Sequence, residues 1–291
     1  MSRDTQFDSL LPPLRLDRRG FVVTALASGF TLATGHVAAA TAIATSSEGL
    51  TAGPVRIPAQ GGDMPAYRAA PAGASGLPVV LVASEIFGVH EYIQDVCRRL
   101  AHAGYLAIAP ELFARQGDPS GYTEIGRLRS EVIEKVPDAQ VMADLDAAAA
   151  WAAQHGADPK RLMITGFCWG GRIVWLYAAH NRDLRAGAAW YGHFRGTTSA
   201  IKPVDPIDVL DKLAAPVIGL YGEADSGIPV ADVEFMRDAL ADGSPAAQAS
   251  VIQLYKEAPH GFHADYRPSY RQDAAEDGWR RMLDWFKQHG G

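Results

Sequence analysis

The sequence predicts an α/β fold, a doubly wound and mostly parallel sheet flanked by helices. Short runs that are apolar on both faces recur along the chain, as in the central strands of a parallel sheet. Helical patterns separate these runs, and strand–helix alternation is typical of a doubly wound sheet. The 291 residues are 48% apolar and 21% charged, which is the composition of a globular protein.

Six apolar runs are the predicted strands. They cover residues 77–83, 106–109, 162–165, 186–191, 216–221 and 250–255. The predicted helices cover residues 92–102, 139–154, 172–180, 230–240 and 270–287. Residues 51–70 are expected to form an antiparallel hairpin at one edge of the sheet. Length alone favours about two domains. No repeat or change of composition divides residues 51–291, so we expect one domain there.

The first forty residues resemble an export signal, with residues 41–50 as a linker. Arg18 and Arg19 precede an apolar stretch over residues 21–33, and three alanines at 38–40 offer a cleavage site. The paired arginines resemble the twin-arginine signal, which predicts a periplasmic protein. A cut after Ala44 remains an alternative. The apolar stretch is shorter than the ~20 residues that span a bilayer, so a stable membrane anchor is not expected.

Charge and composition limit the partners. The net charge of −6 argues against nucleic acid as a partner. No cluster of residues has metal-ligand spacing, and no glycine-rich phosphate motif follows a strand. We therefore expect a monomer that acts on a small-molecule substrate, with no metal and no organic cofactor.

The strongest catalytic signal is the run from Gly166 to Gly171, which lies between a predicted strand and a helix. It has the form G-x-C-x-G-G, a nucleophile elbow with cysteine in place of serine. The helix N-terminus beyond the elbow favours a thiolate. Cys168 is thus the candidate nucleophile, although a free cysteine is more commonly a buried packing residue. Cys97 lies on the apolar stripe of a predicted helix and is assigned to packing.

Two further candidates follow later strands. Asp225 lies in the turn after 216–221, and His260 lies in the loop after 250–255. A carboxylate can orient a histidine that acts as general base. Glu223 and His263 are the competing residues for these two roles. The order nucleophile, acid, histidine is that of the α/β-hydrolase fold.

The loop after residues 77–83 supplies the remaining candidates. In this fold a backbone N–H from that loop and the N–H after the nucleophile form the oxyanion hole, here Ile86 and Trp169. Glu85 is unexpected there, because an acid would repel the developing negative charge. A solvated loop acid is the alternative reading of Glu85. Tyr191 and His193 follow the strand at 186–191 and are candidates for lining the pocket.

Five segments together resemble the dienelactone hydrolase (carboxymethylenebutenolidase) family, and the likeness extends from about residue 50 to the end. They are Glu85-Ile-Phe-Gly-Val, Pro110-Glu-Leu-Phe-Ala-Arg, Gly166-Phe-Cys-Trp-Gly-Gly, Gly222-x-x-Asp and His260-Gly-Phe. The resemblance implies an α/β-hydrolase with a triad of Cys168, His260 and Asp225. It also implies that Glu85 pairs with the resting thiol and takes its proton when substrate binds.

The resemblance implies a substrate that carries a carboxylate. Arg115 matches one family arginine that binds this group. The family's second arginine falls four residues after the catalytic histidine, where this chain has Ala264. The nearest arginine is Arg267. Recognition of the carboxylate is therefore expected to be weakened or rearranged.

We therefore expect an exported hydrolase that cleaves an ester or a lactone through a cysteine nucleophile and an acyl-enzyme. A carboxylesterase or thioesterase of the same fold is the nearest alternative. A second alternative is an exported redox or binding protein in which Cys168 is oxidised or pairs with Cys97. No C-x-x-C motif is present, which argues against a disulfide oxidoreductase.

Overall fold

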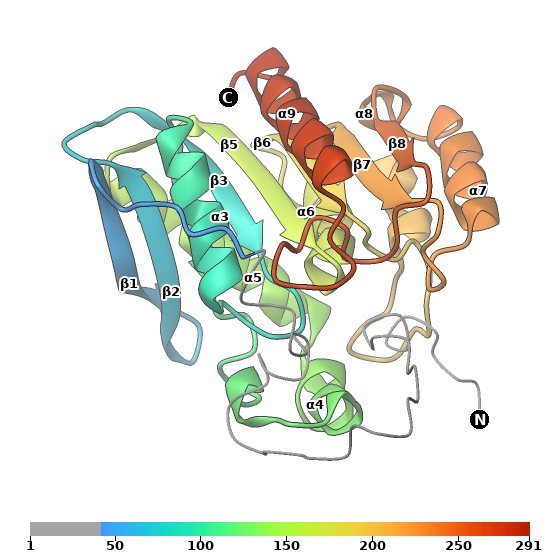
Figure 1. Ribbon diagram of the computed structural model, residues 1–291, viewed down its shortest axis with the longest axis horizontal. Helices are drawn as coiled ribbons and strands as arrows, with labels where there is room; N and C mark the ends of the chain where they lie inside the picture. The colour runs from blue at the N-terminus through green and yellow to red at the C-terminus, as the bar shows by residue number, and fades with distance from the viewer. Residues whose placement is uncertain (1–41) are drawn as a thin grey trace, which may run out of the picture.

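The predicted sheet is present in the computed structural model, which describes residues 42–291 (Figure 1). The export signal predicted for residues 1–40 lies outside the described residues. Within them the sheet has eight strands in the order β1-β2-β4-β3-β5-β6-β7-β8. The strands are β1 (Leu50–Ala59), β2 (Gly62–Pro71), β3 (Leu77–Ala83), β4 (Leu106–Pro110), β5 (Ala157–Phe167), β6 (Leu184–Trp190), β7 (Val217–Gly222) and β8 (Val251–Tyr255).

The strand pairing agrees with a mostly parallel sheet. β1 and β2 form the expected antiparallel hairpin at one edge, and β2 pairs with β4 in antiparallel register. Every later neighbour pair, from β4–β3 to β7–β8, is parallel. β5 begins at Ala157, five residues earlier than predicted, and Ala157 pairs with Leu77 across a register shift.

Helices cover both faces of the sheet. α3 and α9 lie over the face turned to the viewer in Figure 1, and α5 and α6 lie behind it. The helices are α3 (Glu91–His102), α4 (Ile125–Glu131), α5 (Asp138–Gln154), α6 (Trp169–His180), α7 (Val230–Ala241), α8 (Pro245–Gln248) and α9 (Gln272–Gln288). α4 and α8 were not predicted. Both are short, and α4 buries only Ile125 and Leu128, too few to make a periodic pattern.

The core is formed between the central strands and these helices. Residues 79–83 of β3 are all at most 1% exposed, as expected of a strand covered on both faces. α6 is buried over ten of its twelve residues, since it packs in the middle of the molecule against β5 and β6. No helix within residues 42–291 has the length and apolar character needed to cross a membrane.

The topology decides where the site lies. The parallel strands end at one edge of the sheet, and ligands of such sheets bind beyond that edge. Ser84 follows β3, Cys168 follows β5, Tyr191 follows β6 and Glu223 follows β7. The residues predicted to act together are therefore carried by neighbouring loops.

Candidate active site

Cys168 occupies a sharp turn between β5 and α6. Its backbone has φ 55° and ψ −115°, a region that non-glycine residues rarely adopt and that costs about 1–3 kcal/mol. Its N–H donates to Trp190 O at 3.0 Å, and its carbonyl accepts from Gly171 N at 2.9 Å. The side chain is fully buried. The turn therefore fixes the thiol at the N-terminus of α6.

The glycines around Cys168 are required by close backbone contacts. A Cβ on Gly166 would lie 2.3 Å from Gly170 O, and one on Gly170 would lie 2.2 Å from Ala83 O. These contacts bring the end of β3 against the start of α6. The glycine spacing seen in the sequence is thus the condition for packing the elbow against the next loop.

His260 and Asp225 form the predicted pair. The Nδ1 atom of His260 lies 2.7 Å from Oδ2 of Asp225, and both side chains are 1% exposed. The other carboxylate oxygen of Asp225 accepts the Gly227 N–H at 2.8 Å. Burial tends to raise the pKa of Asp225, but His260 and these hydrogen bonds outweigh it and hold that pKa below its usual value. Asp225 can therefore stay ionised and orient the imidazole.

The opposite side of His260 faces the thiol. Burial lowers the pKa of His260, but the charges of Asp225 and of the neighbouring Cys168 outweigh it and raise the pKa to about 10. Nε2 of His260 is buried and makes no geometrically complete hydrogen bond. The three predicted triad residues thus come together, while His263 lies elsewhere, with its Nδ1 2.5 Å from the Tyr92 hydroxyl.

Glu85 is in the site but does not contact the thiol. The Tyr266 hydroxyl donates to its Oε2 at 2.5 Å, and Arg267 Nη2 lies 3.7 Å from its Oε1. His90 Nε2 lies 3.6 Å from Oε2. The expected pairing with the resting thiol is therefore not found in this structure. The physical reason is that a phenol and a guanidinium, both buried, are the partners of the carboxylate in this structure.

The charge on Glu85 is stabilised where it lies. Burial raises its pKa, but Arg267, His90 and Tyr266 outweigh that effect and lower the pKa to about 2. Arg267 Nε also donates to the Tyr266 oxygen at 3.0 Å, so the three groups form one buried cluster. Sequence reasoning missed Tyr266 as a member. Its only signal is its place directly before Arg267 in the loop after His260.

The two predicted oxyanion donors lie on adjoining segments. Trp169 begins α6, and the first N–H groups of a helix have no acceptor within it. Ile86 is fully buried in the loop after β3. Glu111 supports this loop, because its Oε1 accepts the Val89 N–H at 2.9 Å. Burial raises the pKa of Glu111 to about 6. This supporting carboxylate was not identified from the sequence.

Arg115 does not lie with Cys168, His260 and Glu85. Its guanidinium makes a bidentate ion pair with Asp144, at 2.6 and 2.8 Å, and its Nε donates to Gln60 O. It lines a separate hollow of about 340 Å³ with Gln60, Asp144 and part of α5. The structure therefore gives Arg115 a partner within the protein, and Arg267 is the arginine beside the thiol and Glu85.

Tyr191 and His193 lie at two different depths. Tyr191 is fully buried with φ 39°, and its ring packs edge-on against His260 at 5.1 Å between centroids. His193 lines a cavity of about 450 Å³ together with Trp169. Basic side chains line the same cavity, namely Arg129, Arg172, Arg195 and Lys202. Trp169, the residue after Cys168, is thus part of the wall of this cavity.

Buried polar atoms with unused hydrogen-bonding capacity gather around Cys168. Within the described residues, no hydrogen bond is made by Ser84 Oγ, Glu85 Oε1, Tyr191 Oη or Arg267 Nη2. Native proteins satisfy most buried polar atoms, so such a concentration points to a site that binds a polar ligand. The donors on Tyr191 and Arg267 suit a ligand with oxygen acceptors.

Metal and disulfide chemistry find no support in the described part of the chain. No group of three or more histidine, cysteine, aspartate or glutamate side chains there could hold a metal ion. Cys97 and Cys168 are both free and buried. Burial raises the pKa of Cys97 well above its usual value, so this thiol is unreactive.

Known proteins resemble this chain over most of its length. The sequence model of the protein family described as the dienelactone hydrolase family matches residues 64–290. A Methylorubrum extorquens protein named "Putative carboxymethylenebutenolidase" is 57% identical, over 99% of this chain and 98% of its own. An Escherichia coli K12 protein of the same name is 54% identical, over 93% and 98%. A crystal structure titled "Putative Dienelactone Hydrolase", from Klebsiella pneumoniae, is 57% identical with a TM-score of 0.80, covering 82% of this chain and 99% of that one.

Proposed function

Because the chain belongs to the dienelactone hydrolase family, a family of α/β-hydrolases, we propose that it cleaves an ester or lactone with Cys168 as nucleophile. His260 is the general base and acid, and Asp225 orients it. The observation that carries the proposal is one buried line of groups. Asp225 bonds to Nδ1 of His260, and the other side of His260 faces the thiol at the turn into α6.

The chemistry begins with the thiolate of Cys168. Its sulfur attacks the carbonyl carbon, and the resulting oxyanion is stabilised by the N–H groups of Ile86 and Trp169. The carbon–oxygen bond of the ester breaks as His260 gives its proton to the departing alkoxide. In a lactone that alkoxide stays attached to the acyl group. Water then attacks the thioester while His260 takes its proton, which releases the acid and restores the thiolate.

Glu85 acts before the attack. The family mechanism requires a carboxylate that takes the thiol proton as substrate binds. Here the ionised carboxylate rests against Tyr266 and Arg267, and the thiol faces His260. Because Glu85 is ionised in this arrangement, the proton taken from the thiol must already have passed to His260, which later gives it to the departing alkoxide. Glu85 then keeps negative charge away from the oxyanion by bonding to Tyr266.

Substrate recognition depends on Arg267 and Tyr191. Their unused donors lie among the buried groups around Cys168, and a carboxylate or carbonyl oxygen can accept from both. Arg115 is held by Asp144, so a substrate carboxylate can reach Arg267 only, which it would share with Glu85 and Tyr266. We therefore expect that the enzyme cleaves simple esters, which have no carboxylate to bind. We also expect that its preference for a carboxylate-bearing lactone depends on Arg267.

The test is turnover of a carboxylate-bearing dienelactone and of p-nitrophenyl acetate by the wild type and by Cys168→Ala. The variant is expected to lose at least about 10³-fold in kcat/KM on both, because the nucleophile is removed. Cys97→Ala removes the other buried thiol and is the matched control, expected to stay near wild type. Full activity of Cys168→Ala would refute the cysteine mechanism. Turnover of the aryl ester alone would favour the carboxylesterase alternative.

Export and assembly are proposals of a separate kind. The paired arginines support export through the twin-arginine route to the periplasm. The second proposal is that the exported protein is a monomer without a membrane anchor. Cell fractionation tests the first point, since replacing Arg18 and Arg19 with lysine is expected to retain the protein in the cytoplasm. Unchanged periplasmic yield would contradict that route. Gel filtration of the purified protein tests the second point.

A further inference from the structure

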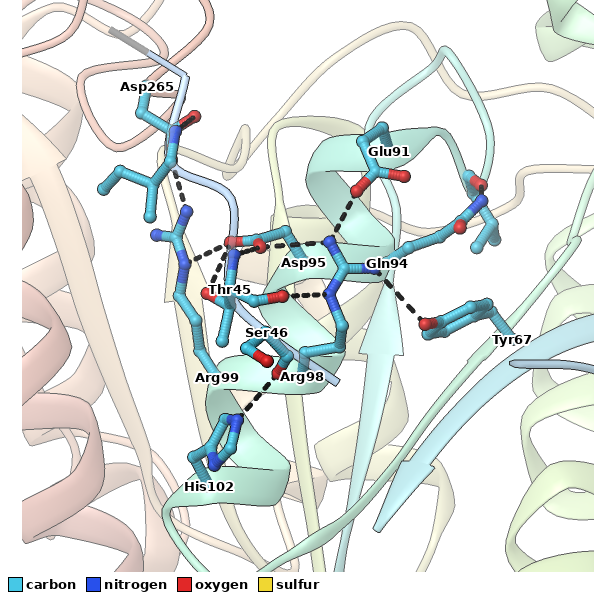
Figure 2. A network of polar contacts seen from close by, with 12 residues as sticks. Thr45, Ser46, Tyr67, Glu91, Gln94, Asp95, Arg98, Arg99, His102 and Asp265 are labelled. Carbon is cyan, nitrogen blue, oxygen red and sulfur yellow. Dashed lines mark hydrogen bonds and ion pairs between the residues drawn. The ribbon is translucent and has the colours of Figure 1, made fainter. Parts of the chain in front are cut away.

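The segment that begins the described chain lies along α3 and is fixed there by polar contacts (Figure 2). The Thr45 N–H donates to Oδ1 of Asp95 at 2.6 Å, and the Thr45 hydroxyl donates to Oδ2 at 3.2 Å. Arg98 Nε returns a bond to Thr45 O at 2.9 Å, and His102 reaches Ser46 O at 2.8 Å. We name residues 43–46 the N-terminal strap.

The strap supplies hydrogen-bond donors to a buried carboxylate on α3, that of Asp95. Asp95 is 1% exposed and also binds Arg98 Nη2 at 3.1 Å and Arg99 Nε at 2.5 Å. A buried carboxylate is tolerated when its lone pairs are all satisfied, and Thr45 supplies two of the four donors. The strap is therefore part of the folded domain and not a linker outside it.

The same network reaches the loop that carries the catalytic histidine. Arg99 Nη2 donates to Oδ2 of Asp265 at 2.5 Å, and the Ile43 N–H donates to Oδ1 of Asp265 at 3.3 Å. Asp265 is 2% exposed and directly precedes Tyr266 and Arg267. Figure 2 shows Arg99 between Asp95 and Asp265, so one side chain joins helix α3 to this loop.

We infer that the N-terminal strap is a positioning element of the enzyme. Together with Asp95 and Arg99 it holds Asp265, and thereby keeps Tyr266 and Arg267 in place against Glu85. The inference rests on the proposed role of Glu85. It also changes how residues 41–50 are understood, because the sequence assigned them to a linker.

A consequence concerns the end of the mature chain. Processing must leave Ile43 in place, since its N–H donates to Asp265. A cut after Ala40 keeps the whole strap, whereas a cut after Ala44 removes Ile43. The structure thus distinguishes the two cleavage sites that the sequence leaves open.

Intact-mass analysis of the protein recovered from the periplasm tests the processing consequence without any activity measurement. A first residue at or before Ile43 is the expected result, and a first residue of Thr45 or later would overturn the inference. An unprocessed chain retains the strap and supports the inference, while it counts against the export proposal.

The positioning role is tested in the full chain by the double variant Ile43→Pro/Thr45→Pro. It removes both backbone donors and alters no charge. The groups that face Glu85 are Arg267, His90 and Tyr266, with the phenols of Tyr92 and Tyr191 and the imidazole of His263 beyond them. Because none of these is changed, a shift of the acid limb of kcat/KM reports geometry alone.

We expect that limb to move up by about half a pH unit and kcat to fall about threefold. Ser46→Ala is the control, since the Ser46 side chain bonds only to the exposed Glu48 N–H, and it should match wild type. Thr45→Val is a milder variant for use if the double variant does not fold. A lower melting temperature with an unchanged acid limb would mean that the strap only stabilises the fold. Cys168→Ala in the same assay shows whether the proposed function itself has failed.

Discussion

Tyr266 decides where the charge of Glu85 rests. Its hydroxyl donates to the carboxylate and accepts from Arg267, so it connects an acid and a base whose nearest charged atoms lie 3.7 Å apart. All three groups are buried, and a buried charge without a full set of partners is costly. The cluster therefore explains how an acid can lie beside the proposed oxyanion hole, because its charge is held by Tyr266 and Arg267.

Tyr266→Phe is predicted to move the acid limb of activity to higher pH. The change removes one donor from Glu85 and leaves Arg267, so the Glu85 pKa rises from its value of about 2. Loss of a hydrogen bond to a buried carboxylate is worth roughly one pH unit. The kcat/KM profile from pH 2 to 8 measures the shift. Tyr255→Phe is the control, because Tyr255 bonds to Asp277 on α9. Superimposable profiles for Tyr266→Phe and wild type would contradict the prediction.

At the scale of elements, the contact between the nucleophile elbow and the end of β3 is the tightest constraint. Gly170 lies against Ala83 O and Ser84 O, and both neighbours are backbone atoms. Backbone that is hydrogen-bonded into a central sheet has no room to move. The same contact holds the start of the loop that carries Ile86 against α6, so the fold and the proposed oxyanion donors depend on one glycine.

Gly170→Ala is therefore predicted to destabilise the protein by at least about 3 kcal/mol. The new methyl group would lie 2.2 Å from Ala83 O. Urea unfolding followed by circular dichroism measures the effect. Gly126→Ala in α4 is the matched control, because its Cβ would meet nothing within 4 Å. A helix position of that kind is expected to gain up to about 1 kcal/mol. Equal midpoints for the two variants would refute the argument.

The sequence predicted the sheet well because its strands carry a strong local signal. The run at 77–83 is continuous, and β3 has these bounds in the structure. The edge hairpin was also predicted, with β1 and β2 within a residue of its expected ends. α4 was missed, since a seven-residue helix with two buried side chains has no clear period. Local patterns therefore predict the elements that are long and deeply buried.

The site was predictable where the residues follow strands. Cys168, Asp225 and His260 each follow a strand, so the topology brings them together. The partners of Glu85 and Arg115 were not predictable in this way. Tyr266 reaches Glu85 across 181 residues, and Asp144 reaches Arg115 from the middle of a helix. Such pairings depend on how loops and helix faces pack, which a motif does not encode.

At the scale of the whole molecule, the active site places several ionised groups in the interior. Glu85 is fully buried and has its pKa lowered to about 2, because Arg267, His90 and Tyr266 outweigh burial. His260 has its pKa raised to about 10, because Asp225 and Cys168 outweigh burial. Because the pKa of Glu85 is lowered and that of His260 is raised, the stability of the fold depends on pH at both the acid and the alkaline end.

The stability of the fold is predicted to be greatest in a mildly acidic window. The Glu85 pKa is depressed from 4.5, so its contribution is complete above pH 4.5 and is lost as pH falls towards 2. The His260 pKa is raised from 6.5, so its contribution is complete below pH 6.5 and is lost as pH rises through 10. Together they predict highest stability between about pH 4.5 and 6.5, with losses of about 3 kcal/mol or more at the extremes.

Two variants separate the limbs of this profile. Glu85→Gln keeps the size of the side chain and removes its titration, so the fall of melting temperature below pH 4.5 should flatten. His260→Gln should flatten the fall above pH 6.5. It should also weaken the fall below pH 3.8, because His260 holds the pKa of Asp225 below its usual value. Thermal unfolding from pH 3 to 10 measures both.

Glu111 also affects the position of the stability maximum. Burial raises its pKa from 4.5 to about 6, so its contribution to the stability of the fold is lost as pH rises from 4.5 through 6. It therefore displaces the maximum towards the acid end of the window, and a maximum above pH 8 in the wild type would contradict the prediction.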